Sequence, residues 1–207
     1  MVAAHRQHRP HLPAEHCPFC PGSGKVPDHY DLLIYDNDFP VLVPDPPAPD
    51  DVATGLYRSA PSYGKCEVVL YTPEHDRKLW ELDDDHLARL VDLWAERFQK
   101  LGADPNHRYV LIFENRGEEV GVTIHHPHGQ IYAYPFIPLK IARELESMKL
   151  HHQETGRCLM CDIHEAERAF GERIIAENEH FIAYLPFFSD FPYGVFIASK
   201  AHRPSLL

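Results

Sequence analysis

The sequence predicts an α+β fold, in which a strongly curved antiparallel sheet carries helices on one side. Three observations lead to this prediction: short β-rich runs bounded by Pro and Gly, one long stretch with helical apolar periodicity, and a C-x-x-C-led pattern that occurs twice. The chain has 207 residues, of which 44% are hydrophobic and 25% are charged. These values are typical of ordered globular proteins, and the length suits one large domain or two small ones.

Apolar, β-branched and aromatic residues gather in several short runs that we expect to form strands. Residues 30–44 read as two short strands separated by a turn at residues 36–38. The run 45–64 is rich in Pro, Asp and Gly and predicts a loop. The remaining predicted strands are residues 66–71, 108–114 and 129–137.

Two helices are predicted. The first begins near Asp83, whose carboxylate can cap it, and ends near Gly102. Its apolar residues recur at spacings of three and four, which predicts one buried stripe made of Leu87, Leu90, Val91, Trp94 and Phe98. The second helix covers residues 139–152, and we expect Leu145 and Met148 to face inward.

The charge of the chain narrows the classes of partner. The formal net charge is −11 with histidines neutral, which disfavours nucleic acid backbones and anionic lipid. Apolar runs fall short of the ~18 residues that a membrane helix needs. The N-terminal MVAAHRQHRPHLP lacks the apolar stretch of a signal peptide. We therefore expect a cytoplasmic protein that binds neither nucleic acid nor membrane.

One pattern of sequence motifs occurs twice along the chain. Both copies read C-x-x-C, strand, proline, strand, histidine, and they run from Cys17 to His75 and from Cys158 to His202. We interpret them as one full repeat over residues 1–155 and a truncated second repeat over residues 156–207. Coincidence is the alternative, because each of these patterns is short.

Four of the five cysteines fall in the two C-x-x-C pairs, and Cys66 stands alone. In a cytoplasmic chain this spacing favours a metal site over a disulfide. A redox pair would need a thioredoxin-like β-α-β context, which neither pair has.

The segment HPHGQ places His126, His128 and Gln130 at every second position. In an extended chain these three side chains share one face, and Gly129 leaves the backbone approachable. The preceding loop, residues 115–121, could cradle phosphate through its N–H groups. The functional interpretation is a site for an anion or a metal, and the alternative is that each histidine is an ordinary surface or core residue.

His128 has the chemistry that nucleotidyl transfer needs. Neutral imidazole is a good nucleophile near pH 7, and a covalent intermediate divides one difficult displacement into two easier ones. The other ring nitrogen needs an acceptor that fixes the tautomer, and a backbone carbonyl of the same segment could supply it. Gln130 could donate a hydrogen bond to a non-bridging phosphate oxygen as charge rearranges.

The motif FENRG, followed by VG and HPHGQIYA, resembles the active-site signature of galactose-1-phosphate uridylyltransferases, a branch of the histidine triad superfamily. The resemblance implies a HIT-like fold and transfer of UMP between UDP-glucose and galactose 1-phosphate, by a ping-pong mechanism through uridylyl-His128. It makes Gln130 the phosphate-stabilising residue. The further substrate-binding positions that it implies are Asn37, Asp38, Phe39, Asn115, Gly121, Thr123 and His126.

The same resemblance implies one structural zinc ion, held by Cys17, Cys20, His75 and His126. Two thiolates and two imidazoles suit a tetrahedral site, although reduced cysteines without metal are the alternative and iron is not excluded. Glu144 matches a glutamate of a second family metal site, whose histidines would lie beyond Leu207, so we expect that site to be incomplete. Cys158 and Cys161 match no ligand position, which leaves packing thiols or a degenerate repeat.

Relative to the family pattern, the chain is expected to lack an N-terminal arm and most of the second repeat. A homodimer, or an assembly with a chain that supplies the second repeat, is the expected oligomer. Two alternatives to the transferase remain open. One is a nucleotide phosphorylase or hydrolase of the same superfamily, and the other is a zinc-stapled half-subunit that is active only with a partner chain.

Overall fold

The computed structural model describes residues 17–50, 55–117, 120, 122 and 124–207. The chain divides into two compact units, Met1–Ile137 and Pro138–Leu207. Within the described residues, no helix combines the length and the apolar character that crossing a membrane requires.

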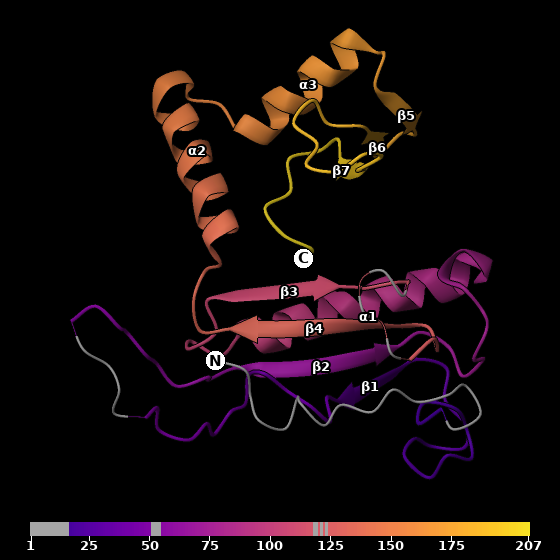
Figure 1. Ribbon diagram of the computed structural model, residues 1–207. Helices are drawn as coiled ribbons and strands as arrows, with labels where there is room; N and C mark the ends of the chain where they lie inside the picture. The colour runs from indigo at the N-terminus through magenta and orange to yellow at the C-terminus, as the bar shows by residue number, and fades with distance from the viewer. Residues whose placement is uncertain (1–16, 51–54, 118–119, 121, 123) are drawn as a thin grey trace. The chain divides into compact units, whose positions relative to one another are not determined.

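The first unit contains a four-stranded antiparallel sheet, which confirms the predicted α+β class (Figure 1). The strand order is β1-β2-β4-β3, and every neighbouring pair is antiparallel. The strands are β1 Leu33–Asp36, β2 Lys65–Leu70, β3 Tyr109–Phe113 and β4 His128–Tyr134. β4 is a central strand, so both of its edges are hydrogen-bonded.

The second strand predicted within residues 30–44 is wrong. Val43 forms only an isolated parallel bridge with Tyr63, in which the Val43 N–H donates to the Ser62 carbonyl at 3.0 Å. Pro40 and Pro44 flank this segment, and proline has no N–H to contribute to a ladder. The residues described between 45 and 62 contain no strand, as predicted.

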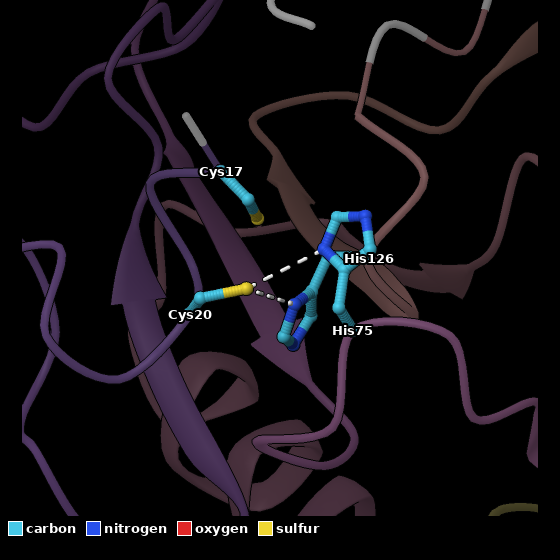
Figure 2. Close-up of side chains that lie close together, drawn as sticks. All are labelled: Cys17, Cys20, His75 and His126. Atoms are coloured by element: carbon cyan, nitrogen blue, oxygen red, sulfur yellow. Dashed lines mark hydrogen bonds between the residues drawn. The ribbon is translucent and has the colours of Figure 1, made fainter. Parts of the chain in front are cut away.

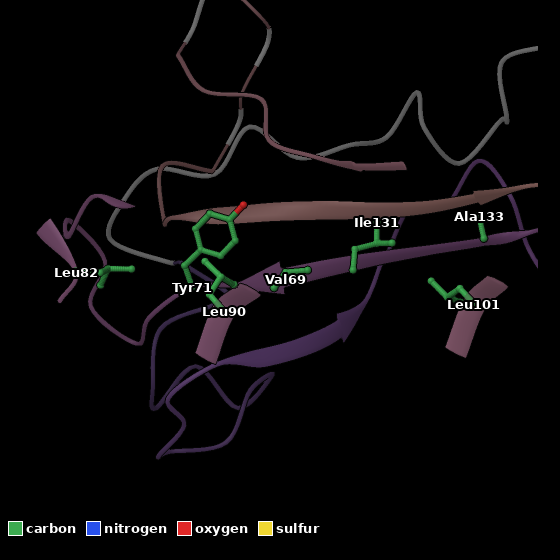
Figure 3. Close-up of a cluster of buried hydrophobic side chains, with 7 residues drawn as sticks. All are labelled: Val69, Tyr71, Leu82, Leu90, Leu101, Ile131 and Ala133. Carbon is green, nitrogen blue, oxygen red and sulfur yellow. The ribbon is translucent and has the colours of Figure 1, made fainter. Parts of the chain in front are cut away.

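Helix α1, Asp84–Gly102, covers one face of this sheet and begins where it was predicted. The Asp83 carboxylate accepts a hydrogen bond from the His86 N–H at 2.8 Å, which satisfies a donor of the first turn. A short 3₁₀ turn, η3 Leu79–Glu81, precedes the helix. The core between helix and sheet consists of Val69, Tyr71, Leu82, Leu90, Leu101, Ile131 and Ala133 (Figure 3).

The predicted apolar stripe of α1 is wrong at one position. Leu90 is buried and Leu87 and Trp94 pack against the core, but Val91 is 51% exposed. Leu93 takes its place against the core. Residues 86, 90, 93, 97 and 101 follow the helical period more closely, so the buried stripe passes through Leu93 and not Val91.

The opposite face of the sheet is covered by the cysteine-containing segment before β1. Val68 and Leu70 of β2 pack there with Cys17, Phe19 and Val26. Because side chains alternate along a strand, β2 contributes to core packing on both faces of the sheet. The second face also carries His128 and Gln130 of β4, which pair with Leu70 and Val68.

The second unit consists of two helices and a three-stranded antiparallel sheet of order β5-β6-β7. Its elements are α2 Leu139–Thr155, α3 Leu159–Phe170, β5 Ile174–Glu177, β6 Phe181–Tyr184 and β7 Phe196–Ser199. α2 was predicted to turn Leu145 and Met148 inward, but it has no buried residue: Leu145 is 47% exposed and Met148 is half-buried. α2 belongs to the second compact unit, whereas the repeat boundary predicted after residue 155 concerns sequence repetition and stays a prediction.

A buried ion pair joins the first sheet to α1, and its loss should destabilise the unit. Arg97 donates to both carboxylate oxygens of Glu67, whose side chain is 3% exposed. We expect Arg97→Ala to lower the free energy of unfolding by about 3–5 kcal/mol, because it leaves a buried carboxylate without its partner. The measurement is urea denaturation followed by circular dichroism.

Arg89→Ala is the matched control, since Arg89 lies on the same helix and pairs with Asp31 at an exposed position. It should change the unfolding free energy far less. Equal effects of the two substitutions would contradict the importance of the buried pair.

Candidate functional site

The functional segment enters the sheet at the first residue of β4, His128. The Pro127 carbonyl just before it accepts a hydrogen bond from the Tyr71 N–H at 3.2 Å, which ties the segment to the end of β2. His128 pairs in register with Leu70, and Gln130 pairs with Val68. His128 and Gln130 therefore share the sheet face opposite α1, as the alternation predicted.

Phe19 covers this face between the two histidines. Its ring lies edge-on to His126, with centroids 6.1 Å apart, and edge-on to His128, with centroids 5.5 Å apart. His126 precedes the strand and is 1% exposed, whereas His128 is half-buried. Two imidazoles separated by one residue thus have different environments.

The orientation of His128 is set by the chain itself. Its Nδ1 lies 2.7 Å from the backbone carbonyl oxygen of His126. A carbonyl only accepts, so Nδ1 carries the proton and the lone pair of the neutral ring is on Nε2. The prediction that a carbonyl of the same segment fixes the tautomer is confirmed.

Gln130 is oriented in a similar way. Its side-chain oxygen accepts a hydrogen bond from the Tyr132 hydroxyl at 3.0 Å. With the oxygen engaged, the amide presents its N–H donors to the surroundings of the same face. Such an amide suits an anionic oxygen and not a cation.

Four potential metal ligands converge beside this face, from three separate parts of the first unit. The donor atoms of Cys17, Cys20, His75 and His126 all lie within 4.8 Å of one another. Figure 2 shows Cys20 Sγ directed at both imidazoles, 3.4 Å from His75 Nδ1 and 3.6 Å from His126 Nδ1. Ligand distances of about 2.3 Å for sulfur and about 2.0–2.1 Å for nitrogen give a tetrahedral S···N edge of about 3.6 Å. The cluster fits a metal ion of the zinc type.

The surroundings prepare His126 to bind through Nδ1. Its Nε2 lies 2.7 Å from the Thr72 carbonyl oxygen, so Nε2 carries the proton and the Nδ1 lone pair faces the cysteines. Burial lowers the pKa of His126 to about 4, which keeps the ring neutral at physiological pH. Burial, with Cys17 beside it, raises the pKa of Cys20 to about 11, so a cation is needed to favour the thiolate.

Tyr30 is a contributor that the sequence did not identify. Its hydroxyl donates to the Phe19 carbonyl at 2.7 Å and lies 3.1 Å from both the Thr72 carbonyl oxygen and His126 Nε2. It therefore links the cysteine-containing segment before β1 (the cysteine loop, residues 17–26), the chain just after β2, and His126. No local pattern marks this role, because the three partners are distant in sequence.

The predicted uridine-binding segment forms a turn after β1. The Asn37 side chain accepts from the Phe39 N–H at 2.9 Å, and Asp38 bonds Lys25 at 2.9 Å and the Tyr35 hydroxyl at 2.8 Å. The Tyr35 ring lies edge-on to Phe19, with centroids 5.6 Å apart. Since Phe19 also contacts His128, aromatic packing connects this turn to the catalytic candidate.

The remaining predicted positions are placed only in part. Asn115 follows β3, two residues after Phe113, which pairs with Gln130. Gly121 and Thr123 lie outside the described residues. Glu144 is exposed on α2, as expected for a carboxylate without its partner ligands.

Comparisons with known proteins agree with this site. A family model described as galactose-1-phosphate uridyl transferase, N-terminal domain, matches residues 3–138. The chain belongs to the galactose-1-phosphate uridylyltransferase family. The match covers both the cysteine loop and the HPHGQ segment, so the two candidate sites fall within one family domain.

Individual relatives support the same conclusion. A galactose-1-phosphate uridylyltransferase of Thermotoga maritima is 40% identical over all of this chain, and one of Streptomyces lividans is 36% identical over 95% of it. A solved uridylyltransferase superposes on the whole chain with a TM-score of 0.87 at 35% identity. An ADP-glucose phosphorylase of Arabidopsis thaliana superposes on 99% of it with a TM-score of 0.76 at 25% identity.

The chain spans 65% of the Thermotoga protein and 52% of the Streptomyces protein. It likewise covers 64% of the solved uridylyltransferase. Its neighbours are HIT-like, as predicted, and the two antiparallel sheets and three α-helices formed by the described residues belong to that shared architecture.

Tyr30→Phe should weaken metal binding at the first cluster without abolishing it. Removing the hydroxyl releases the contacts that hold His126 and the cysteine loop together, and such outer partners are worth about 10- to 100-fold in metal affinity. Zn²⁺ affinity is measured by competition with a chromophoric chelator. Tyr35→Phe, which removes a hydroxyl that donates to Asp38 and not to the metal cluster, should leave the affinity near that of the wild type. An unchanged affinity in Tyr30→Phe would exclude the proposed support.

Gly129→Ala should destabilise the family domain. A Cβ at this position would lie 2.1 Å from the Tyr71 hydroxyl oxygen, 2.9 Å from Tyr71 Cζ and 3.2 Å from the Phe113 carbonyl oxygen. We expect a loss of about 1–3 kcal/mol from overpacking, measured by urea denaturation, and partial recovery in the double variant with Tyr71→Phe. Gly102→Ala is the control, since nothing lies within 4 Å of its added carbon.

Proposed function

We propose that this chain carries out nucleotidyl transfer as a UDP-glucose–hexose-1-phosphate uridylyltransferase of galactose metabolism. It moves UMP between UDP-glucose and galactose 1-phosphate through a covalent uridylyl-His128 intermediate. The observation that supports this most directly is the hydrogen bond from His128 Nδ1 to the His126 carbonyl oxygen, 2.7 Å long. It directs the nucleophilic lone pair to Nε2 before any substrate binds.

In the first step His128 Nε2 attacks the α-phosphorus of UDP-glucose, and the bond from that phosphorus to the oxygen of glucose 1-phosphate breaks. The positive charge that develops on the ring is shared with the His126 carbonyl through the Nδ1–H. In the second step a phosphate oxygen of galactose 1-phosphate attacks the same phosphorus, the N–P bond breaks, and the lone pair returns to Nε2. Each step is a simple displacement, so the atoms balance without a further reactant.

Gln130 stabilises the negative charge that shifts onto the non-bridging phosphate oxygens. Its side-chain oxygen is held by Tyr132, so the N–H donors are available to the phosphate on the face that His128 occupies. Hydrogen bonds of this kind that strengthen in the transition state accelerate the reaction, whereas equal binding of the ground state would not.

A structural zinc ion is the metal that the first cluster suits best. Cys17, Cys20, His75 and His126 would hold it, and two thiolates with two imidazoles leave no open position for a reacting water. The bound ion would supply rigidity, because His126 uses its ring for the metal and its carbonyl for His128. Thiolate ligands favour zinc over the harder oxygen-loving cations.

The substrate contacts follow from the family pattern. By that pattern Asn37, Asp38 and Phe39 hold uracil and ribose, and Asn115, Gly121 and Thr123 bind the phosphates. The buried ring of His126 is occupied by the cysteine cluster and the Thr72 carbonyl, so His126 supports the phosphate site through its main-chain oxygen, which holds His128. The proposed partner in solution is a second copy of the chain.

A nucleotide phosphorylase is the second candidate function. It is favoured by the superposition on an ADP-glucose phosphorylase, with a TM-score of 0.76 over 99% of the chain. The two candidates share the histidine nucleophile and differ in the second acceptor, which is a hexose 1-phosphate in one case and inorganic phosphate in the other.

Intact-mass spectrometry after incubation with UDP-glucose tests the proposal. The protein should gain the mass of one UMP group, and adding galactose 1-phosphate should discharge it. His128→Asn should gain nothing, because it removes the attacking nitrogen. His125→Asn, at the exposed neighbouring histidine, should label like the wild type. Labelling of His128→Asn, or a wild type that does not label even with a candidate partner chain, would refute the proposal.

Substrate competition separates the two functions. A transferase is labelled by UDP-glucose and discharged by galactose 1-phosphate. A nucleotide phosphorylase, the second candidate, is labelled by ADP-glucose and discharged by inorganic phosphate.

A further inference from the structure

A second cluster of metal-binding side chains lies in the second unit. The donor atoms of Cys158, Cys161 and His202 lie within 4.8 Å of one another. Cys161 Sγ is 3.3 Å from His202 Nδ1. Both cysteines are half-buried, so neither is the packed core thiol that the sequence suggested as one alternative.

The geometry of this cluster repeats that of the first. In each, the second cysteine of a C-x-x-C pair meets the Nδ1 of a histidine that follows a strand, at 3.4 Å from Cys20 to His75 and 3.3 Å from Cys161 to His202. Both values are close to the S···N edge of about 3.6 Å expected for a tetrahedral zinc site. Two independent segments of the chain have therefore brought the same atoms to the same spacing.

Local structure explains how the cysteines converge. Cys158 is the residue that precedes the first turn of α3, and Cys161 lies within that turn. Residues three apart at a helix start lie on the same side of the helix, which points both sulfurs toward the segment after β7. His202 comes from that segment, three residues after Ser199.

The second unit has a small apolar core. Among residues 138–207, all of which are described, the buried hydrophobic side chains are Ile182 and Tyr184. A metal cross-link would add to the stability that so small a core supplies. All five cysteines are free thiols in this structure, so a metal is the available cross-link.

The geometry points to a second metal site, in which Cys158, Cys161 and His202 bind Zn²⁺ and staple the start of α3 to the end of β7. These three side chains leave one position of a tetrahedron to a ligand outside the set. The site is separate from the four-ligand cluster of the first unit and does not depend on the proposed nucleotidyl transfer. It would contribute rigidity to the second unit as the first cluster does to His128.

Zinc stoichiometry of the purified full-length chain tests this site. Inductively coupled plasma mass spectrometry should find two zinc ions per wild-type chain, and one each in Cys161→Ser and Cys20→Ser. Cys66→Ser, which changes a buried thiol outside both clusters, should retain two. With Co²⁺ in place of Zn²⁺, the Cys20→Ser chain should still show thiolate-to-cobalt charge transfer and the intense visible bands of tetrahedral cobalt.

A measurement on the unaltered chain covers the case in which a variant fails to fold. Zn²⁺ should slow alkylation of Cys158 and Cys161 by N-ethylmaleimide, read by peptide mass spectrometry, and a chelator should restore the rate. Equal alkylation with and without Zn²⁺ would overturn the inference. So would a wild-type chain that binds one zinc ion and loses it completely in Cys20→Ser. Either result can occur whether or not His128 accepts UMP, because neither measurement depends on turnover.

Discussion

The hydrogen bond from His128 Nδ1 to the His126 carbonyl joins the two halves of the candidate site, and most of the first unit serves to hold its two ends. His126 is fixed by the cysteine cluster on one ring nitrogen and by the Thr72 carbonyl on the other. His128 is fixed by its place as the first residue of a central strand. A side chain held in this way would have little freedom to lose if a substrate bound beside it, which is the entropic advantage of a preorganised site.

The central strand β4 separates two tasks by the simple alternation of its side chains. Ile131 and Ala133 enter the core under α1, whereas His128 and Gln130 face the cysteine loop. Gly129 falls on the core side at the point where the Tyr71 hydroxyl approaches the backbone. His128 and Gln130 can therefore lie beside a well-packed core without their own polar side chains having to enter it.

Local patterns predicted much of this arrangement. The period of α1, the cap at Asp83, the run that forms β2 and the spacing of HPHGQ are all encoded by neighbours in sequence, so they could be predicted from the sequence. The errors arose where tertiary contacts decide. Val91 lies at an acceptable helical spacing, yet the sheet meets Leu93 instead.

Long-range convergence was the part that residue patterns could not supply. Tyr30 joins partners from three segments, and no spacing rule marks it. The first metal set was assigned only through the family resemblance. The contact between Cys161 and His202 was not predicted, because a C-x-x-C pair by itself does not say whether a histidine 41 residues away folds back to it.

His126 contributes to its neighbours through two chemically unrelated atoms, a ring nitrogen toward the cysteines and a main-chain oxygen toward His128. Every amino acid possesses that oxygen, whereas few possess the nitrogen. A lineage that exchanged this side chain would forfeit a metal ligand and still present the acceptor that selects the tautomer, provided the local backbone path survived. The metal site and the orientation of the His128 ring could thus change independently in evolution, even though both involve residue 126.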